Sequence, residues 1–210
     1  MTRRIRDRVI NPDEDPVAWR LALERAGIPD QQRRATIGAI REAKIATWAA
    51  GVCDNAPDWM GNGIGFYLHG PLNAGKSALA AVLGMEGLRR AEKVMWLPVR
   101  DVPLARFREG ERGKALDDQL RDADLLILDD LGAERFRLSS AAGPALEETL
   151  RIMYDRGRSV VITSNIEWGE FITTSPYARE AAPLVSVIRR KCHPVPIVNE
   201  QWPLSPESLR

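Results

Sequence analysis

The sequence predicts an α/β fold in which helices cover both faces of a parallel β-sheet, and three observations lead to this prediction. Short apolar runs alternate with longer segments of helical periodicity along most of the 210 residues. The apolar runs are unbroken, which is typical of strands that are buried on both faces. Hydrophobic residues make up 44% of the chain, enough for one domain with a substantial core.

The N-terminal part is predicted to hold two helices and a loop ahead of the first strand. The first helix begins after Asp15, a good N-cap, with Pro16 as its first residue, and it stops before Gly27. A second helix is expected over residues 35–50, where apolar side chains recur at helical spacing. The stretch 51–63 is rich in Gly, Asn, Asp and Pro, and it therefore predicts a loop.

Strands and helices alternate from residue 64 onwards. Strands are predicted over 64–69, 94–99, 125–128 and 159–163, and helices over 76–91, 101–109, 114–122 and 141–156. The proline-rich tail over 194–210 can hold one edge strand but no helical domain. The expected organisation is an N-terminal arm and helix over 1–34, a core over 35–199 and a C-terminal tail over 200–210.

Residues 70–77, Gly-Pro-Leu-Asn-Ala-Gly-Lys-Ser, match the phosphate-binding pattern G-x-x-x-x-G-K-[S/T] between a predicted strand and a predicted helix. Gly70 and Gly75 let the backbone point its N–H groups at phosphate oxygens. Lys76 brings a positive charge to the β- and γ-phosphates, and the Ser77 hydroxyl can bind Mg²⁺. The motif predicts a nucleoside triphosphate site. The residues expected to contact the nucleotide are Gly70, Asn73, Ala74, Gly75, Lys76, Ser77 and Ala78.

A second motif is the apolar run 125–128 followed directly by Asp129 and Asp130. A buried strand that ends in carboxylates is the Walker B arrangement, in which Asp129 would bind Mg²⁺ directly or through water. Asp130 would then orient and deprotonate the attacking water. Two adjacent aspartates also suit a helix N-cap, but their place downstream of a complete phosphate loop favours the catalytic interpretation.

The next predicted strand runs into Thr163, Ser164 and Asn165. A polar side chain at this strand end would lie beside the γ-phosphate, where Asn165 would position the hydrolytic water. Thr-Ser-Asn is also ordinary turn chemistry, and the residues alone leave both interpretations open.

These motifs together resemble the DnaC/IstB group of AAA+ ATPases, which includes replicative helicase loaders and the ATPase helpers of transposases. The resemblance extends from about residue 19 to residue 198. It includes residues 26–29 (Ala-Gly-Ile-Pro), similar to the motif that opens the core of that group, and Asp-Asp-Leu-Gly at 129–132 paired with Thr-Ser-Asn at 163–165. That pair is specific to the group, whereas the phosphate loop alone is not.

The resemblance implies a five-stranded parallel AAA+ core of strand order 5-1-4-3-2, without a separate C-terminal lid. It implies that ATP and Mg²⁺ are the cofactors and that Asn165 is the sensor residue. It further implies that hydrolysis is completed across a subunit interface, in a ring or open spiral on DNA. The trans-acting arginine of the group corresponds to Val187, so Arg189 or Arg190 would act from a shifted register or be an exposed basic residue.

The function predicted first is an ATPase that assembles on single-stranded DNA and loads a replicative helicase. The first alternative is a transposase helper that binds duplex DNA and selects a target. The second is an adaptor that hydrolyses little and uses ATP as a structural switch. Only about thirty residues precede the core, too few for the separate N-terminal domain of several loaders, so the partner is the least determined feature.

Composition excludes several other classes. A net charge of +1 argues against a DNA-coating protein, so nucleic acid would be bound through a local patch. Two basic stretches qualify, although charge runs are more often solvated faces. The two cysteines lack metal or disulfide spacing, and no apolar run is long enough to span a membrane, so a cytoplasmic location is expected. Among the tryptophans, Trp59 and Trp202 fall in predicted loops and are candidates for base stacking. The first basic stretch contains Arg3, Arg4, Arg6 and Arg8. The second contains Arg100, Arg106, Arg108 and Arg112, and by the resemblance these correspond to residues that loaders of the group direct into the ring channel.

Overall fold

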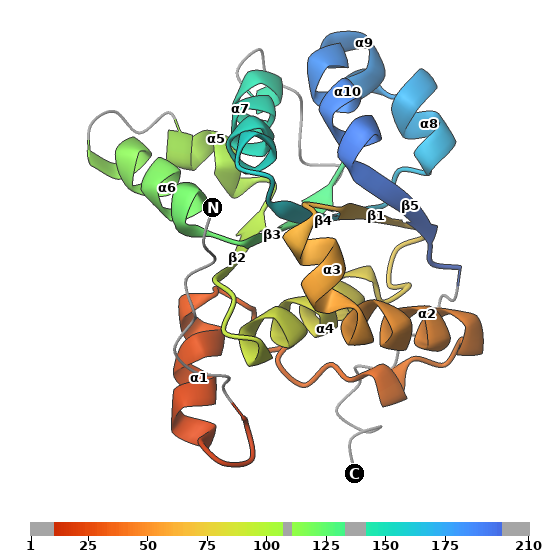
Figure 1. The fold of residues 1–210 in the computed structure, drawn as a ribbon. Helices are drawn as coiled ribbons and strands as arrows, with labels where there is room; N and C mark the ends of the chain where they lie inside the picture. Colours follow the sequence, from red (N-terminus) through yellow and green to blue (C-terminus); the bar gives the residue numbers. More distant parts are fainter. Residues whose placement is uncertain (1–10, 107–110, 133–141, 199–210) are drawn as a thin grey trace.

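The computed structural model describes residues 11–106, 111–132 and 142–198, and its centre is a five-stranded parallel β-sheet (Figure 1). The strand order β2-β3-β4-β1-β5 is the order that the resemblance implied, and it confirms the predicted α/β fold. The strands are β1 (Gly65–His69), β2 (Val94–Pro98), β3 (Leu125–Leu131), β4 (Ser159–Ser164) and β5 (Cys192–Pro196).

Helices cover both faces of the sheet, as Figure 1 shows. One layer consists of α1 (Pro16–Arg25), α2 (Ala43–Asp54), α3 (Ala56–Gly61) and α4 (Lys76–Arg89). The other consists of α5 (Asp101–Arg106), α6 (Glu111–Asp122), α7 (Ala142–Asp155), α8 (Trp168–Thr173), α9 (Pro176–Glu180) and α10 (Ala182–Lys191). None of the helices in the described residues combines the length and the apolar character needed to cross a bilayer.

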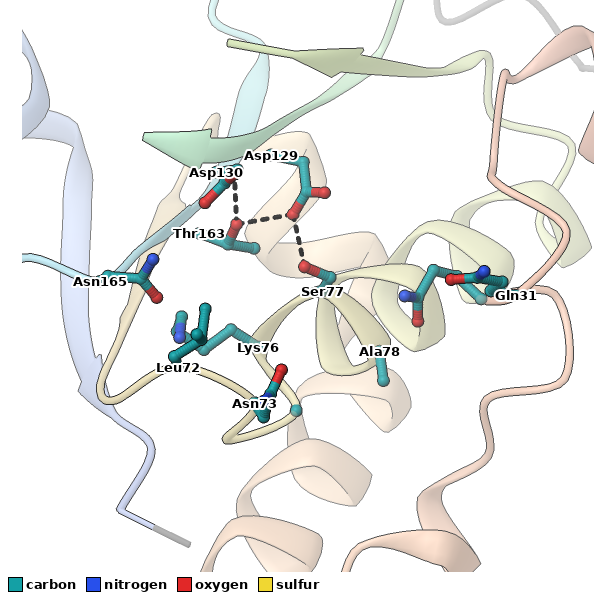
Figure 2. Close-up of a pocket in the computed structure, with 12 residues that line it drawn as sticks. Gln31, Leu72, Asn73, Lys76, Ser77, Ala78, Asp129, Asp130, Thr163 and Asn165 are labelled. Carbon is teal, nitrogen blue, oxygen red and sulfur yellow. Dashed lines mark hydrogen bonds between the residues drawn. The ribbon is translucent and has the colours of Figure 1, made fainter. Parts of the chain in front are cut away.

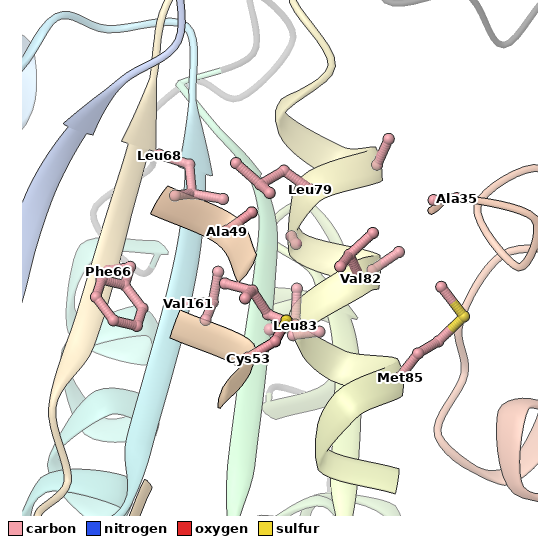
Figure 3. Packing of buried hydrophobic residues seen from close by; sticks show 14 of the residues in the cluster. Ala35, Ala49, Cys53, Phe66, Leu68, Leu79, Val82, Leu83, Met85 and Val161 are labelled. Atoms are coloured by element: carbon pink, nitrogen blue, oxygen red, sulfur yellow. The ribbon is translucent and has the colours of Figure 1, made fainter. Parts of the chain in front are cut away.

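Each face of the sheet has its own hydrophobic core. Along β3, Leu125 and Ile127 belong to the core on the α4 side, while Leu126 and Leu128 belong to the core on the α7 side. Successive side chains of a strand point to opposite faces, and both faces are covered, so an unbroken apolar run is required. Figure 3 shows the α4-side core, where Leu79 and Leu83 pack against the sheet.

The first helix follows the prediction. The Asp15 carboxylate accepts a hydrogen bond from the Ala18 N–H at 2.9 Å, and Pro16 opens α1. The chain then turns at Gly27, which has a φ of 73°. Helix α1 packs onto the α4-side core through Leu23, which is buried.

The second helix is present but its predicted bounds were wrong, as was the loop predicted after it. Residues 37–39 form a short 3-10 helix, α2 begins only at Ala43, and most of the supposed loop 51–63 is helical because α2 runs to Asp54 and α3 follows. Pro57 suits the first turn of a helix, where its missing N–H costs nothing. Buried side chains on α2 and α3 pack into the α4-side core, and this packing outweighs the glycine- and proline-rich composition.

The structure also corrects the interpretation of Trp59 as a base-stacking residue. Trp59 lies in α3, is only 5% exposed, and packs edge-on against Phe66 with the ring centroids 5.2 Å apart. Its indole N–H donates to the Val52 carbonyl at 2.8 Å. The side chain is therefore part of the core, while Trp202 lies outside the described residues.

The candidate nucleotide-binding site

The phosphate-binding loop connects β1 to α4, as the motif predicts. Its backbone has positive φ at Gly70 (153°), Asn73 (60°) and Gly75 (90°), and Gly75 is the N-cap of α4. Asparagine adopts the left-handed region more readily than most residues with a side chain. The loop therefore curls around the N-terminus of a 14-residue helix, where backbone N–H groups and the helix dipole favour an anion.

Lys76 is held inside this loop. Its side chain is 7% exposed, and its ammonium group donates to the carbonyls of Gly70 at 3.0 Å and Pro71 at 2.6 Å. Burial lowers the pKa of Lys76 below its ordinary value, whereas the nearby carboxylates of Asp130 and Asp129 act in the opposite direction. An anionic ligand in the loop would supply the ammonium with a charged partner in place of two neutral carbonyls.

Ser77, Asp129 and Thr163 form a hydrogen-bonded group beside the loop (Figure 2). The hydroxyls of Ser77 and Thr163 both donate to Asp129 Oδ1, at 2.7 Å and 2.6 Å. Burial raises the pKa of Asp129, and the two hydroxyl donors oppose that shift because they stabilise the carboxylate. The predicted pair Ser77 and Asp129, which come from α4 and β3, therefore does meet in space.

This pair also fits the predicted metal. A hydroxyl and a carboxylate oxygen are the hard donors that Mg²⁺ prefers, and Mg²⁺ usually takes one or two protein oxygens with water and phosphate completing its shell. The described residues contain no group of three or more His, Cys, Asp or Glu side chains that would form an all-protein metal site. A metal beside Ser77 and Asp129 would therefore depend on the phosphates of a bound nucleotide.

Asp130 and Asn165 face the same cavity. They line a pocket of about 420 Å³ together with Lys76, Ser77 and Asp129. Asp130 is exposed and has a φ of 69°, an unusual value for a residue with a side chain. Figure 2 shows both side chains on the wall of the pocket beyond Lys76. Gly75, Asn73 and Ala78 also line the pocket. Gly70 and Ala74 do not: the Gly70 carbonyl accepts a hydrogen bond from Lys76, and Ala74 is buried in the core.

Four further residues line the pocket without having been assigned a role from the sequence: Gln31, Gln32, Leu72 and Thr163. The two glutamines follow the Ala-Gly-Ile-Pro motif at 26–29 after one intervening residue, Asp30, and that motif was the only signal for them. Gln32 Oε1 is buried and has no hydrogen-bond partner among the described residues. Thr163 belongs to the Thr-Ser-Asn motif, but only Asn165 was given a function there.

Arg189 and Arg190 do not line this pocket within their own chain. Both are exposed in the last turn of α10, and the Arg190 guanidinium lies over the Tyr154 ring at 5.5 Å from its centroid. Val187, at the position of the group's arginine, is only 5% exposed and packs in the α7-side core. If either arginine acts on a nucleotide, that nucleotide belongs to another subunit.

The predicted channel residues are described only in part. Arg100 is exposed, with its Nε 3.8 Å from the Asp101 carboxylate. Arg106 and Arg112 lie in α5 and α6, but their side chains fall outside the description, as does all of Arg108. The N-terminal basic stretch Arg3 to Arg8 also lies outside the described residues.

Comparison with solved structures places this fold beside a helicase loader. The chain superimposes on the "Crystal structure of the DnaC helicase loader" with a TM-score of 0.68, over 80% of this chain and 99% of that chain. The sequence identity is 19%, so the likeness concerns the AAA+ fold.

Sequence comparison identifies two relatives from Sinorhizobium fredii (strain NBRC 101917 / NGR234). "Putative insertion sequence ATP-binding protein y4iQ/y4nD/y4sD" is 30% identical over 140 residues, which cover 65% of this chain and 44% of the relative. "Putative insertion sequence ATP-binding protein y4pL" is 36% identical over 126 residues, which cover 58% of this chain and 50% of the relative. The chain therefore matches about half the length of each relative.

The family model described as "IstB-like ATP binding protein" matches residues 55–208. That match contains the phosphate loop, the two aspartates and the Thr-Ser-Asn segment whose geometry is given above. The matched range includes every residue that lines the pocket except Gln31 and Gln32. The chain has the AAA+ core fold and belongs to the IstB-like ATP-binding protein family.

Proposed function

We propose that this chain is an ATP-hydrolysing helper of a transposase, which assembles on duplex DNA and positions the transposase at a target. The observation that carries the proposal is a pocket lined by the phosphate loop, both aspartates and Asn165, in a chain whose two sequence relatives are named as insertion sequence ATP-binding proteins. The sequence motifs alone favoured helicase loading, and these relatives move the preference to the transposition alternative.

In this proposal, different residues of the nucleotide site bind the phosphates, hold the metal and activate the attacking water. Backbone N–H groups of the loop and the Lys76 ammonium would hold the phosphates, and Ser77 and Asp129 would hold Mg²⁺. Bound Mg²⁺ would neutralise charge on the transferred phosphoryl group. Asp130 would accept a proton from the attacking water, and Asn165 would orient that water.

Assembly into a homo-oligomer would complete this site. Arginine side chains that reach the γ-phosphate from a neighbouring subunit stabilise the charge of the transition state. Arg189 and Arg190 are exposed at the end of α10 and are the candidates for this role. The buried Val187 supports the alternative of a slowly hydrolysing adaptor, because it occupies the position where the group has its arginine.

Helicase loading is the second candidate, supported by the fold likeness to the DnaC helicase loader. DNA binding distinguishes the candidates, measured with a slowly hydrolysed ATP analogue on single-stranded and duplex DNA over a salt series. Preference for duplex, with a steep salt dependence, is expected for the transposition helper. Preference for single strands would overturn that proposal in favour of the loader.

Two substitutions test the enzymatic part. Lys76→Ala should abolish nucleotide binding, and the exposed Lys44 of α2 offers the matched control Lys44→Ala. Asp130→Asn should preserve nucleotide binding but reduce kcat by about 10²–10⁴-fold, the usual contribution of a general base. Asp118→Asn, at an exposed position of α6, is its control. An Asp130→Asn protein that still supports transposition would favour the adaptor.

A further inference from the structure

The hydrogen-bonded ladder between β3 and β4 is interrupted at the site. Leu128 pairs with Ile162, and the next paired residues are Leu131 and Ser164. Two residues of β3, Asp129 and Asp130, therefore lie opposite a single residue of β4, Thr163. This two-to-one count is a β-bulge, a feature that re-aims side chains and is common beside active sites.

The hydroxyl of Thr163 bridges the bulge in two directions. It accepts a hydrogen bond from the Asp130 N–H at 2.8 Å and donates one to Asp129 Oδ1 at 2.6 Å (Figure 2). Thr163 itself is 1% exposed, and both hydrogen bonds are partly buried. The Thr163 hydroxyl is thus hydrogen-bonded both to the backbone of Asp130 and to the carboxylate of Asp129.

Ser164, the next residue of β4, forms hydrogen bonds on the C-terminal side of the bulge. The Ser164 hydroxyl donates to the Leu131 carbonyl at 2.7 Å and accepts from the Ile166 N–H at 3.0 Å. The Ile166 carbonyl in turn accepts from the Tyr67 hydroxyl of β1 at 3.0 Å. Asn165 lies between Ser164 and Ile166, so the hydrogen bonds of these two residues also fix its position at the pocket.

We propose that Thr163 is a positioning residue that sets the direction of both aspartates, and this inference rests on the proposed function of the site. Asp130 has positive φ, a conformation that the hydroxyl supports by pairing its N–H. Asp129 faces Ser77 with its Oδ1 accepting hydrogen bonds from the hydroxyls of both Ser77 and Thr163. Without the hydroxyl, the Asp130 N–H loses its hydrogen-bond partner in the protein, and the bulge loses the bonds that link its two aspartates to β4.

A hydroxyl is the chemical group that meets this requirement. It must donate to a carboxylate and accept from an N–H at the same time, which serine and threonine can do and valine cannot. Valine matches threonine in shape, so Thr163→Val removes the two hydrogen bonds with little change in volume. Thr163→Ser keeps both bonds and is the conservative variant.

The test measures nucleotide affinity with a fluorescent ATP analogue in Mg²⁺ and in EDTA, together with kcat and thermal unfolding. Thr163→Val should leave the affinity in EDTA within about twofold and weaken the Mg²⁺-dependent gain by about tenfold, in the range of 10–100-fold seen when a group supporting a metal ligand is lost. We expect a similar loss in kcat, and we expect Thr163→Ser to restore most of both.

Thr149→Val is the matched control, because Thr149 is a fully buried threonine whose hydroxyl donates to the Ala145 carbonyl within α7. It should change stability without changing the Mg²⁺ dependence. If Thr163→Val does not fold, Thr163→Cys, with its weaker donor, should show a graded loss of the Mg²⁺-dependent gain. Either variant, folded and with the Mg²⁺ dependence of the wild type, would overturn the role of Thr163.

These readouts separate the two proposals. A wild-type protein that hydrolyses no ATP, even on duplex DNA, would contradict the proposed ATPase, yet its Mg²⁺-dependent affinity still decides the role of Thr163. Conversely, wild-type behaviour of Thr163→Val beside an inactive Asp130→Asn would refute the positioning role and leave the ATPase standing.

Discussion

Substituting Gly70 by alanine should destabilise the protein at the junction between its phosphate loop and its last strand. Gly70 has a φ of 153°, outside the range that residues with a Cβ commonly adopt. A Cβ here would lie 1.9 Å from the carbonyl oxygen of Ile197, whereas real Cβ contacts are essentially never below 3.0 Å, so the two backbones must separate by about 1 Å.

The size of the effect follows from two contributions. Holding a residue with a side chain in a sparsely populated backbone region costs on the order of 1–3 kcal/mol. The separation also weakens the hydrogen bond from the Ile197 N–H to the His69 carbonyl, which is 2.7 Å long, and a typical net loss is about 0.5–1.5 kcal/mol. We therefore expect Gly70→Ala to lower the free energy of unfolding by about 2–4 kcal/mol.

Urea denaturation of a graded series of glycine substitutions measures this difference. Gly157→Ala introduces backbone strain without a steric clash, because the φ of Gly157 is 63° but no atom lies within 4 Å of the new Cβ. It should lower the free energy of unfolding by about 1–2 kcal/mol. Gly51→Ala lies inside α2 with open space around it, so it should stabilise by about 0.5–1 kcal/mol.

The comparison of Gly70→Ala with Gly157→Ala decides the reasoning. Equal losses of stability in these two variants would mean that Ile197 does not pack against the loop in solution. We also expect Gly70→Ala to weaken ATP binding, because the displaced residue opens the phosphate loop. Unchanged ATP affinity in a destabilised protein would show that the loop geometry is independent of the strand contact.

Two further predictions concern buried titratable groups. Burial raises the pKa of the Cys53 thiol to about 11 and that of Cys192 to about 12, so neither thiol should react appreciably with a disulfide reagent at pH 8 until the protein unfolds; rapid labelling of the native protein would contradict this. Burial lowers the pKa of His69, so the unfolded chain takes up the proton first, and the free energy of unfolding should fall as the pH drops through about 6.5. His69→Gln should flatten this dependence in urea titrations, whereas a flattening by His193→Gln, at an exposed position, would refute the assignment.

The parts of the fold that the sequence predicts are those where local and tertiary requirements agree. The strand before the loop, the loop itself and α4 were predicted because a phosphate site fixes residue types at fixed spacing. The apolar part of β3, which precedes Asp129, was predicted because burial on both faces demands an unbroken apolar run. The Asp129 carboxylate meets Ser77 because parallel strands direct their carboxyl ends to the same edge of the sheet.

The failures come from tertiary packing that composition does not reveal. Residues 51–63 contain turn-forming residues, but Trp59 and Met60 contribute to the core, and α3 forms to bury them. The helices over 168–191 were likewise not predicted, although the apolar face of α10, including Leu184 and Ile188, packs on the α7-side core. The role of Thr163 depends on the register of two strands, which no local pattern encodes.

The strand order explains why the end of β4 bears so strongly on the site. In the order β3-β4-β1, the strand β4, which carries Thr163 and is followed by Asn165, lies between the strand of the aspartates and the strand that leads into the phosphate loop. A displacement of its end therefore reaches both halves of the site at once, and a γ-phosphate bound near Asn165 would act on β3 through Thr163. Under the proposed function, DNA would be bound outside the nucleotide pocket, and Arg100 is an exposed basic residue that does not line this pocket. Replacing Arg100 by alanine should then weaken DNA binding without changing ATP affinity, whereas a loss of ATP affinity would place the DNA and nucleotide surfaces together.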